Sequence, residues 1–407
     1  MRVKDFPYEF TKAIPIVRRL QQAGFTAYFV GGSVRDFLLG KKIIDVDIAT
    51  SAYPAEMKEI FSKTVDVGIE HGTVIVLYGG SSYEVTTFRT ESTYQDYRRP
   101  DSVTFVHTLE EDLKRRDFTI NTLAMDANGD IIDLFAGEAD LQGKIIRAVG
   151  DPHECFHEDA LRMMRSFRFT SQLGFMIEDA TYQAIKENIS LLEKISVERI
   201  QVEFIKLMLG QFRNEGLRFF LESQAVLHVP FLKQRNSQIL EKLLLLPDDK
   251  LRTASQVWAL LGYFLKFSKD EFHQFLREWK QAKAVFYKAY LMLELLKKRE
   301  HAEWTNEWLF QAGLDVALLT EELVQLIWQC GDIEKVKKKF AELPITSRSE
   351  IVVSGNDLQK ELDRTPGEWL GATITKVEQT ILKKELENKY HAIIEFVKSE
   401  GKHDESR

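Results

Sequence analysis

The sequence is poor in the features that mark secreted, disulfide-stapled or membrane-spanning proteins. Its 407 residues include only two cysteines, Cys155 and Cys330, which stand far apart, and no apolar run approaches the length that spans a bilayer. The first ten residues, MRVKDFPYEF, lack the apolar core and small-residue cleavage site of a signal peptide. These absences argue against a disulfide framework and a membrane protein, and we expect a protein of the reducing cytoplasm.

An excess of positive charge is also missing. The chain has 55 lysines and arginines against 62 aspartates and glutamates, which gives a net charge of −7. This balance argues weakly against a nucleic-acid partner. Affinity for RNA follows the number of phosphates contacted, however, so a local basic surface is sufficient. The length exceeds what one hydrophobic core usually supports, and we expect several compact units.

A glycine pair follows the first predicted strand. Residues 27–30, AYFV, predict a short strand, and Gly31 and Gly32 come directly after it and open into VRDFLLG. Glycines at such a turn allow backbone N–H groups to approach a polyphosphate closely. We therefore interpret this segment as a candidate phosphate-binding turn.

Two carboxylates alternate along the strand predicted over residues 43–48, IIDVDI. The period of two places Asp45 and Asp47 on one face and apolar side chains on the other. Paired carboxylates beside a phosphate-binding turn suit Mg²⁺, which binds one or two carboxylates together with substrate phosphates. The alternative is a strand end with two solvated acids. The order of strand, glycine turn, helix and acidic strand favours the metal site.

The motif GGSVRD followed by DVDIAT resembles the nucleotidyltransferases of the DNA polymerase beta superfamily, and within it the bacterial class II CCA-adding tRNA nucleotidyltransferases. RRDFTINTLAMD, EDALRMMRSFRF and PGEWLG resemble later motifs of that family in the same order. The resemblance implies an α+β fold, with a mixed β-sheet in an N-terminal catalytic head and an all-α neck, body and tail. It also implies tRNA, CTP and ATP as partners, and Mg²⁺ as cofactor, although the choice between Mg²⁺ and Mn²⁺ stays open.

A third acid lies on the strand predicted over residues 82–89, SYEVTTFR. Glu84 is either an exposed edge-strand glutamate or a carboxylate beside Asp45 and Asp47. The resemblance favours the second role, because the superfamily usually places a third carboxylate on a neighbouring strand.

Consecutive arginines stand at the start of the helix predicted from residue 114. Arg115 and Arg116 in a first helical turn oppose the helix dipole unless an anion binds there. The alternative is a solvated basic turn. The resemblance assigns nucleotide contact to Arg116, and triphosphate positioning to Gly32 and Arg35.

Residues 158–169, EDALRMMRSFRF, predict one helix with a polar and an apolar face. At about 100° per residue, the polar face holds Glu158, Asp159, Arg162 and Arg165, with Arg168 at its edge. The opposite face holds Ala160, Met163, Met164 and Phe167.

An Asp and an Arg three residues apart can distinguish bases. Cytosine and adenine present an amino donor beside a ring-nitrogen acceptor, whereas uracil and guanine present a carbonyl beside a ring N–H. Asp159 would accept from the amino group and Arg162 would donate to the ring nitrogen, so U or G would leave buried polar groups unpaired. The alternative is a surface ion pair, and the upstream motifs favour base recognition.

Four segments are expected: a catalytic head (1–150), a base-recognising neck (151–210), a helical body (211–320) and a tRNA-binding tail (321–407). Residues 90–103 predict a loop, which in the family is associated with addition of the final adenosine. The predicted function is template-independent addition of C, C and A to the tRNA 3′ end, with release of pyrophosphate, through two metal ions.

Three other functions are compatible with part of the sequence. A bacterial poly(A) polymerase shares the head and neck motifs, but the acidic balance and the PGEWLG tail argue against it. The predicted loop argues against a CC-only adding enzyme, and the intact Asp45, Asp47 and Arg162 argue against a non-catalytic tRNA-binding chaperone. The oligomeric state, a homodimer included, stays open.

Overall fold

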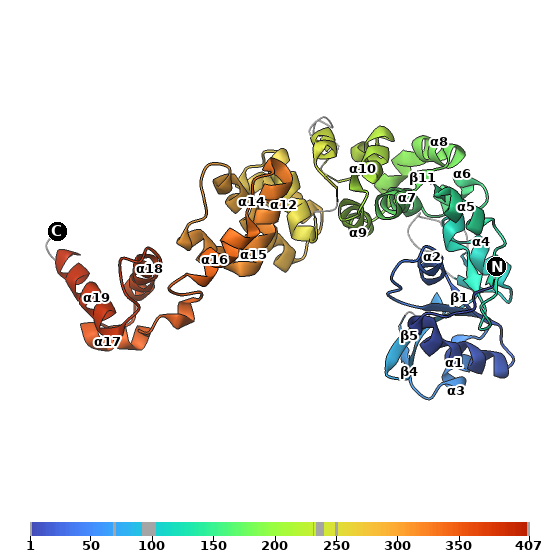
Figure 1. The fold of residues 1–407 in the computed structure, drawn as a ribbon, viewed down its shortest axis with the longest axis horizontal. Helices are drawn as coiled ribbons and strands as arrows, with labels where there is room; N and C mark the ends of the chain where they lie inside the picture. The colour runs from blue at the N-terminus through green and yellow to red at the C-terminus, as the bar shows by residue number, and fades with distance from the viewer. Residues whose placement is uncertain are drawn as a thin grey trace. The chain divides into compact units, whose positions relative to one another are not determined.

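The structure, a computed structural model, divides into two compact units (Figure 1). Unit 1 comprises Met1–Leu244 and Glu278–Lys280, and unit 2 comprises Leu245–Arg277 and Gln281–Arg407. The described residues are 2–67, 71–91, 103–230, 232, 240–248 and 251–404. The finer division into head, neck, body and tail stays a prediction.

A mixed seven-stranded sheet with the order β3-β4-β5-β2-β1-β8-β9 organises the first half of unit 1. Strands β2 and β5 run parallel, and the other neighbouring pairs are antiparallel. The strands are β1 (Ala27–Val30), β2 (Asp47–Thr50), β3 (Thr64–Asp66), β4 (Thr73–Tyr78), β5 (Ser81–Thr87), β8 (Ala124–Met125) and β9 (Ile131–Ile132). The α+β class expected from the sequence is confirmed.

Three helices accompany the sheet, and their starts follow from local sequence. Helix α1 (Tyr8–Gln22) buries one apolar stripe, and α3 (Pro54–Ile60) begins on a proline, whose fixed φ suits a first helical position. Helix α2 (Gly32–Leu38) follows β1 directly. In Figure 1, α2 lies between the sheet and the helices α7 and α9 of the same unit.

The loop predicted over residues 90–103 is framed by a two-stranded sheet. Strand β6 (Arg89–Glu91) pairs antiparallel with β7 (Val103–Phe105). Residues 92–102, which make up most of that loop, lie outside the described part of the chain.

Helices predominate in unit 1 after β9. One further helix of this unit, α4, comes earlier in the chain, before β8. The short strands β10 (Ile145–Ile146) and β11 (Met176–Ile177) pair in parallel. Helix α7 packs against α9 and α10. The helices are α4 (Leu109–Lys114), α5 (Gly137–Gly143), α6 (Pro152–Glu158), α7 (Leu161–Leu173), α8 (Asp179–Asn188), α9 (Val197–Met208) and α10 (Arg213–Glu222).

All regular secondary structure in the described residues of unit 2 is helical. Its helices include α12 (Ala254–Phe264), α14 (Lys283–Arg299), α15 (Asn306–Trp328), α16 (Ile333–Ala341), α17 (Gly355–Leu362), α18 (Glu368–Leu382) and α19 (Tyr390–Asp404). Its last part has a core of its own, formed by α17, α18 and α19 around Ile381 and Ile393. Within the described ranges, no helix combines the length and the apolar character needed to cross a bilayer.

Candidate active site

The turn after β1 brings the backbone close to two charged side chains. Gly31 has a φ of 70°. A Cβ at this position would lie 2.8 Å from Arg116 Nη1 and 3.9 Å from Asp47 Oδ2. The positive φ favours glycine here, and a larger residue would also displace the tip of the Arg116 side chain. The predicted turn is confirmed, and it places Gly32 and Arg35, on α2, next to the start of β2.

Three carboxylates meet where β2 begins. Asp47 pairs with Val30 of β1 on one side and with Glu84 of β5 on the other. Burial raises the pKa of Asp47, and the charges of Glu84 and Asp45 raise it further, against an opposing effect of Arg116. The predicted neighbourhood of the three acids is therefore present.

The prediction that a strand carries Asp45 is wrong. Strand β2 begins at Asp47, because its partner β1 ends at Val30 and the chain then turns into α2. Asp45 lies in the irregular segment before β2 and is exposed. Its nearness to Asp47 comes from sequence adjacency and not from alternation along a strand.

The donor set at this edge of the sheet suits a divalent cation that also binds substrate. No cluster of three or more His, Cys, Asp or Glu side chains among the described residues is arranged to enclose a metal by itself. Adjacent carboxylates that raise the pKa of Asp47 nevertheless favour a bound cation. Since Mg²⁺ binds through one or two carboxylates plus phosphates, the residues fit a metal that arrives with a nucleotide.

Arg115 and Arg116 lie at the end of a helix and not at its start, which corrects the prediction. Helix α4 is capped by Thr108 and ends at Lys114, so both arginines follow its C-terminus, where positive charge is favourable. Buried Asp112 accepts from Arg115 Nη2 at 2.9 Å and from Arg116 Nη2 at 3.1 Å. The two arginines are therefore stabilised without a bound anion.

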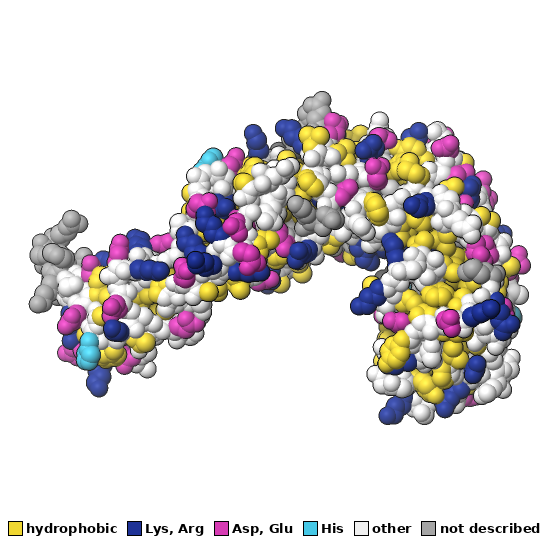
Figure 2. Space-filling model, viewed as in Figure 1, with side chains coloured by type: hydrophobic (Ala, Val, Ile, Leu, Met, Phe, Trp, Pro, Cys, Tyr) yellow, Lys and Arg dark blue, Asp and Glu magenta, His cyan; other side chains and the backbone are white. Residues whose placement is uncertain are grey.

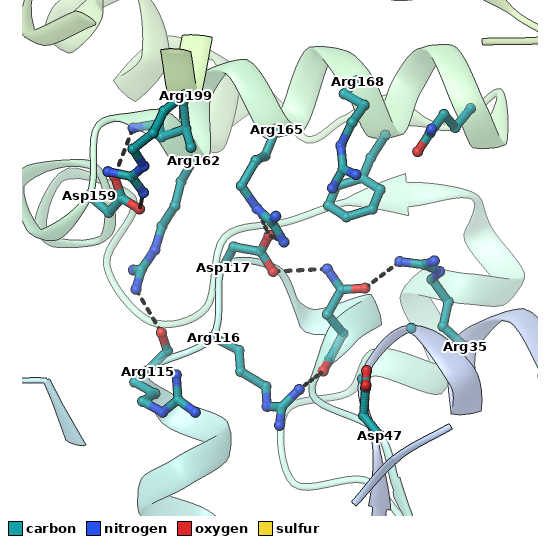
Figure 3. A pocket seen from close by; sticks show the side chains of 16 residues that line it. Arg35, Asp47, Arg115, Arg116, Asp117, Asp159, Arg162, Arg165, Arg168 and Arg199 are labelled. Atoms are coloured by element: carbon teal, nitrogen blue, oxygen red, sulfur yellow. Dashed lines mark hydrogen bonds and ion pairs between the residues drawn. The ribbon is translucent and has the colours of Figure 1, made fainter. Parts of the chain in front are cut away.

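A chain of hydrogen bonds joins α2 to α7. Arg35 Nη1 donates to Asn121 Oδ1 at 2.6 Å, and Asn121 Nδ2 donates to Asp117 Oδ1 at 2.8 Å. Arg165 lies 2.6 Å from Asp117 Oδ2 (Figure 3). Burial alone would raise the pKa of Asp117, but the Arg165 charge and the bonds from Asn121 and Arg165 lower it to about 2. Sequence analysis missed Asn121, because nothing in FTINTL marks it as different from its neighbours.

The apolar face predicted for residues 158–169 is present on α7, whereas of the predicted polar residues only Arg162, Arg165 and Arg168 lie on that helix. Met163, Met164 and Phe167 are fully buried in the core. In Figure 3, Arg165 and Arg168 extend from α7 into the cavity. Arg168, expected at the edge of the polar arc, forms an ion pair with Glu203 of α9 at 2.8 Å.

Asp159 is not helical, contrary to prediction. Helix α6 ends at Glu158 and α7 begins at Leu161. Asp159 lies between them in an extended conformation, and its Oδ1 accepts from Leu161 N at 3.1 Å. Its Oδ2 accepts from Arg199 of α9 at 2.7 Å. The side chain competes for the backbone N–H of the next helix, which is how aspartates break or cap helices.

Arg162 is buried and held by several acceptors. Its Nη1 donates to Glu158 Oε2 at 2.8 Å and to Cys155 O at 3.2 Å, and its Nη2 donates to Arg115 O at 2.6 Å. Figure 3 shows Asp159 directed toward Arg199 and Arg162 extended toward Arg115. Asp159 and Arg162, which are predicted to act together, therefore line the same cavity, and each is held by a different partner, Arg199 for Asp159 and Arg115 for Arg162.

These groups surround a cavity of about 490 Å³. Its charged lining consists of seven arginines and three aspartates, so it favours a polyanion. Asp45 and Glu84 are not among the lining residues and lie beside Asp47. The lining also includes the predicted residues Gly32, Arg35, Arg116, Asp159, Arg162, Arg165 and Arg168, together with Phe169, which sequence analysis did not single out.

Models of three known domain families match the chain. Residues 27–147 match the poly A polymerase head domain, and residues 174–234 match the probable RNA and SrmB-binding site of polymerase A. Residues 249–397 match the putative domain 2 of tRNA nucleotidyltransferases.

Whole-length relatives were found among curated proteins and solved structures. The chain is 49% identical to a CCA-adding enzyme of Enterococcus faecalis and 48% identical to one of Ligilactobacillus salivarius, each over 98% of both chains. The crystal structure of the Bacillus stearothermophilus CCA-adding enzyme in complex with CTP superposes with a TM-score of 0.89, at 40% identity, covering 98% of this chain and all of that one. A tRNA nucleotidyltransferase complexed with a primer tRNA and an incoming ATP analog matches at 25% identity with a TM-score of 0.57, covering 80% of this chain and 98% of that one.

Proposed function

The chain belongs to the family of CCA-adding enzymes, and on that premise we propose that the cavity of unit 1 binds CTP and then ATP and selects both through Asp159 and Arg162. The chain is a nucleotidyltransferase that adds CCA to tRNA. The observation that supports this use of the cavity is that base-reading candidates, a cluster of arginines and the carboxylate of Asp47 line one space.

Asp45 and Asp47 would hold a divalent metal, with Glu84 as a third carboxylate beside them. When bound with substrate, the metal lowers the pKa of the primer 3′-hydroxyl and neutralises charge on the phosphates. Asp47 stands at the start of β2, where the strand pairing places it beside Val30 of β1 and Glu84 of β5, and Asp45 precedes it in the irregular segment. No covalent bond to the protein is required.

The triphosphate would lie against the arginines. Arg35 and Arg116 approach from the sheet side and Arg165 and Arg168 from α7. Gly32 follows the turn at Gly31 and would let backbone amides approach the phosphates. Each arginine is already held by a carboxylate or carbonyl partner, so little rotamer freedom is lost on binding.

The base would lie against Asp159 and Arg162. Asp159 Oδ1 accepts from Leu161 N and Oδ2 accepts from Arg199, and each carboxylate oxygen has two lone pairs, so the carboxylate could also accept from the amino group of cytosine or adenine. Arg162 would donate to the ring nitrogen beside that group. Arg199 fixes the carboxylate and so serves as a positioning residue for base selection.

Transfer RNA would be held in part by unit 2. On the face shown in Figure 2, lysines and arginines are interspersed with aspartates and glutamates over its helices. On α16, for example, Lys335 pairs with Glu303 at 3.0 Å and Lys337 with Glu334 at 2.7 Å. Local basic groups are therefore present on a chain of negative net charge, and RNA phosphates would compete for them.

Primer extension tests this function. A tRNA that lacks its three 3′-terminal nucleotides is incubated with the full-length protein and CTP alone, ATP alone, or both. We expect two added residues with CTP alone, none with ATP alone and three with both. A long tail with ATP would indicate a poly(A) polymerase, and growth that stops after two residues with both triphosphates would indicate a CC-adding enzyme. No growth under any condition would favour a binding protein.

A further inference from the structure

Three guanidinium groups gather around the ring of Phe169. The ring lies on α7 and is 4% exposed. The guanidinium carbon of Arg168 is 4.2 Å from the ring centroid, that of Arg35 is 5.1 Å away and that of Arg165 is 5.4 Å away. These distances lie within the range of cation–π attraction. One aromatic side chain therefore contacts arginines from two separate helices, α2 and α7.

Each of the three arginines also has a carboxylate partner. The ion pairs are Arg35 with Asp36 at 2.8 Å, Arg165 with Asp117 at 2.6 Å and Arg168 with Glu203 at 2.8 Å. The carboxylates come from three different segments, namely α2, the residues after α4, and α9. The ring is the common neighbour of all three cations.

Gathering three cations around one ring, with Arg35 and Arg168 buried and Arg165 half-buried, is unfavourable by itself. Burial lowers the pKa of Arg168 to about 10, and the charges of Arg165 and Arg35 act in the same direction against Glu203. The negative face of an aromatic ring offsets part of this repulsion, and an apolar side chain of the same size would not. An arriving polyphosphate would offset the rest.

We propose that Phe169 is a positioning residue that assembles Arg35, Arg165 and Arg168 into one triphosphate-binding group. The proposal rests on the function proposed above for this cavity. The hydrogen-bond chain through Asn121 and Asp117 already links Arg35 to Arg165. The electrostatic attraction of the ring, beyond its bulk, adds to that link and includes Arg168. Phe169 itself is held edge-on by Phe118, with ring centroids 5.8 Å apart.

The test replaces Phe169 by phenylalanines that carry one, two or three ring fluorines. Fluorination withdraws the negative charge from the ring face but changes its size little. Binding of CTP to the full-length protein is measured by calorimetry, and KM and kcat for CTP are measured with primer tRNA. The matched control is the same series at Phe167, which lies on the same helix but packs against Phe220 at 5.9 Å, away from the arginines.

We expect the Kd and KM for CTP to rise stepwise with fluorine number at Phe169, reaching about tenfold at three fluorines. The value of kcat should change less, because the ring contacts no reacting atom. The Phe167 series should leave Kd unchanged. A flat series at Phe169, or equal changes at both positions, would overturn the proposal and leave Phe169 a packing residue.

Failure of this proposal is distinguishable from failure of the proposed function. If the unmodified protein bound no CTP, the site assignment itself would be wrong. If it bound CTP and the fluorine series were flat, only the role of the ring would be wrong. Should the fluorinated proteins not fold, as judged by Tm, the pair Phe169→Leu and Phe169→Trp serves instead: Trp should retain CTP affinity and Leu should lose it, and equal affinity would refute the proposal.

Discussion

The substitution Asp159→Asn should change which base is accepted and not only the rate of addition. The asparagine oxygen can keep the bond from Leu161 N, now 3.1 Å, and the new amide nitrogen then takes the place of Oδ2, which lies 2.7 Å from Arg199. The position proposed to accept from the amino group of the base becomes a donor. It can then bind the carbonyl that uracil carries in place of the amino group of cytosine.

The magnitude follows from the burial of this group. The Asp159 side chain is 14% exposed, so satisfying or orphaning a partner there is worth about 1 to 3 kcal/mol, or roughly 5- to 150-fold in the UTP to CTP ratio. The gain for UTP should be partial, because Arg162 would still face the ring N–H of uracil. Loss of the charge-assisted bond from Arg199 should also lower the overall rate.

Competition between CTP and UTP on one primer tRNA measures this ratio. Asp151→Asn is the matched control, because Asp151 caps α6 through its side chain and an asparagine caps equally well. The ratio should be unchanged in the control. An unchanged ratio in Asp159→Asn, even with a slower reaction, would refute base recognition by Asp159 and leave it a helix-breaking residue.

Three further results are expected. Asp47→Asn should abolish nucleotide addition, yet in the absence of metal it should raise the Tm at neutral pH. Because the pKa of Asp47 is raised, its charged form destabilises the fold above that pKa, and this destabilisation is relieved as the pH falls through it. The control is Asp66→Asn, because Asp66 forms an exposed ion pair with Lys58. It should change neither nucleotide addition nor the Tm, and a Tm gain equal to that of Asp47→Asn would show that burial of Asp47 is not the cause. Glu84→Gln should lower activity most at limiting Mg²⁺, and parental behaviour there would make Glu84 an ordinary strand residue. Because the pKa of Asp117 is lowered to about 2, its charged form stabilises the fold above pH 4, and this stabilisation is lost as the pH falls toward 2. Asp117→Asn should therefore remove roughly 2 kcal/mol of the pH dependence of the free energy of unfolding in that window. An unaltered acid-unfolding curve would show that Asp117 is not paired.

Periodic features of the sequence predicted the fold well. The strand over residues 27–30, the glycine turn and the apolar face of α7 depend on neighbours within a few residues, so pattern alone predicts them. The resemblance supplied the role of each motif, and the comparisons confirmed the family.

Features that depend on distant contacts could not be predicted. The break at Asp159 is stabilised by Arg199, which lies 40 residues later. Asn121 acquires its role through Arg35, which lies 86 residues earlier. The prediction for Arg115 and Arg116 named the wrong helix end, because RRD is compatible with either end. The cap at Thr108 and the acids that follow it mark the start of α4. The errors at Asp45, at Asp159 and at the two arginines concern element boundaries, and the omission of Asn121 concerns a side-chain contact.

Sequencing of the 3′ ends that the protein makes tests the central claim most directly. A tRNA that lacks its terminal CCA is incubated with equal concentrations of all four triphosphates, and the added nucleotides are sequenced. A site that pairs Asp159 and Arg162 with an amino group and a ring nitrogen predicts CCA, with U and G excluded and growth stopped after three residues. Added U or G at rates comparable to C and A, or a continuing run of A, would contradict it.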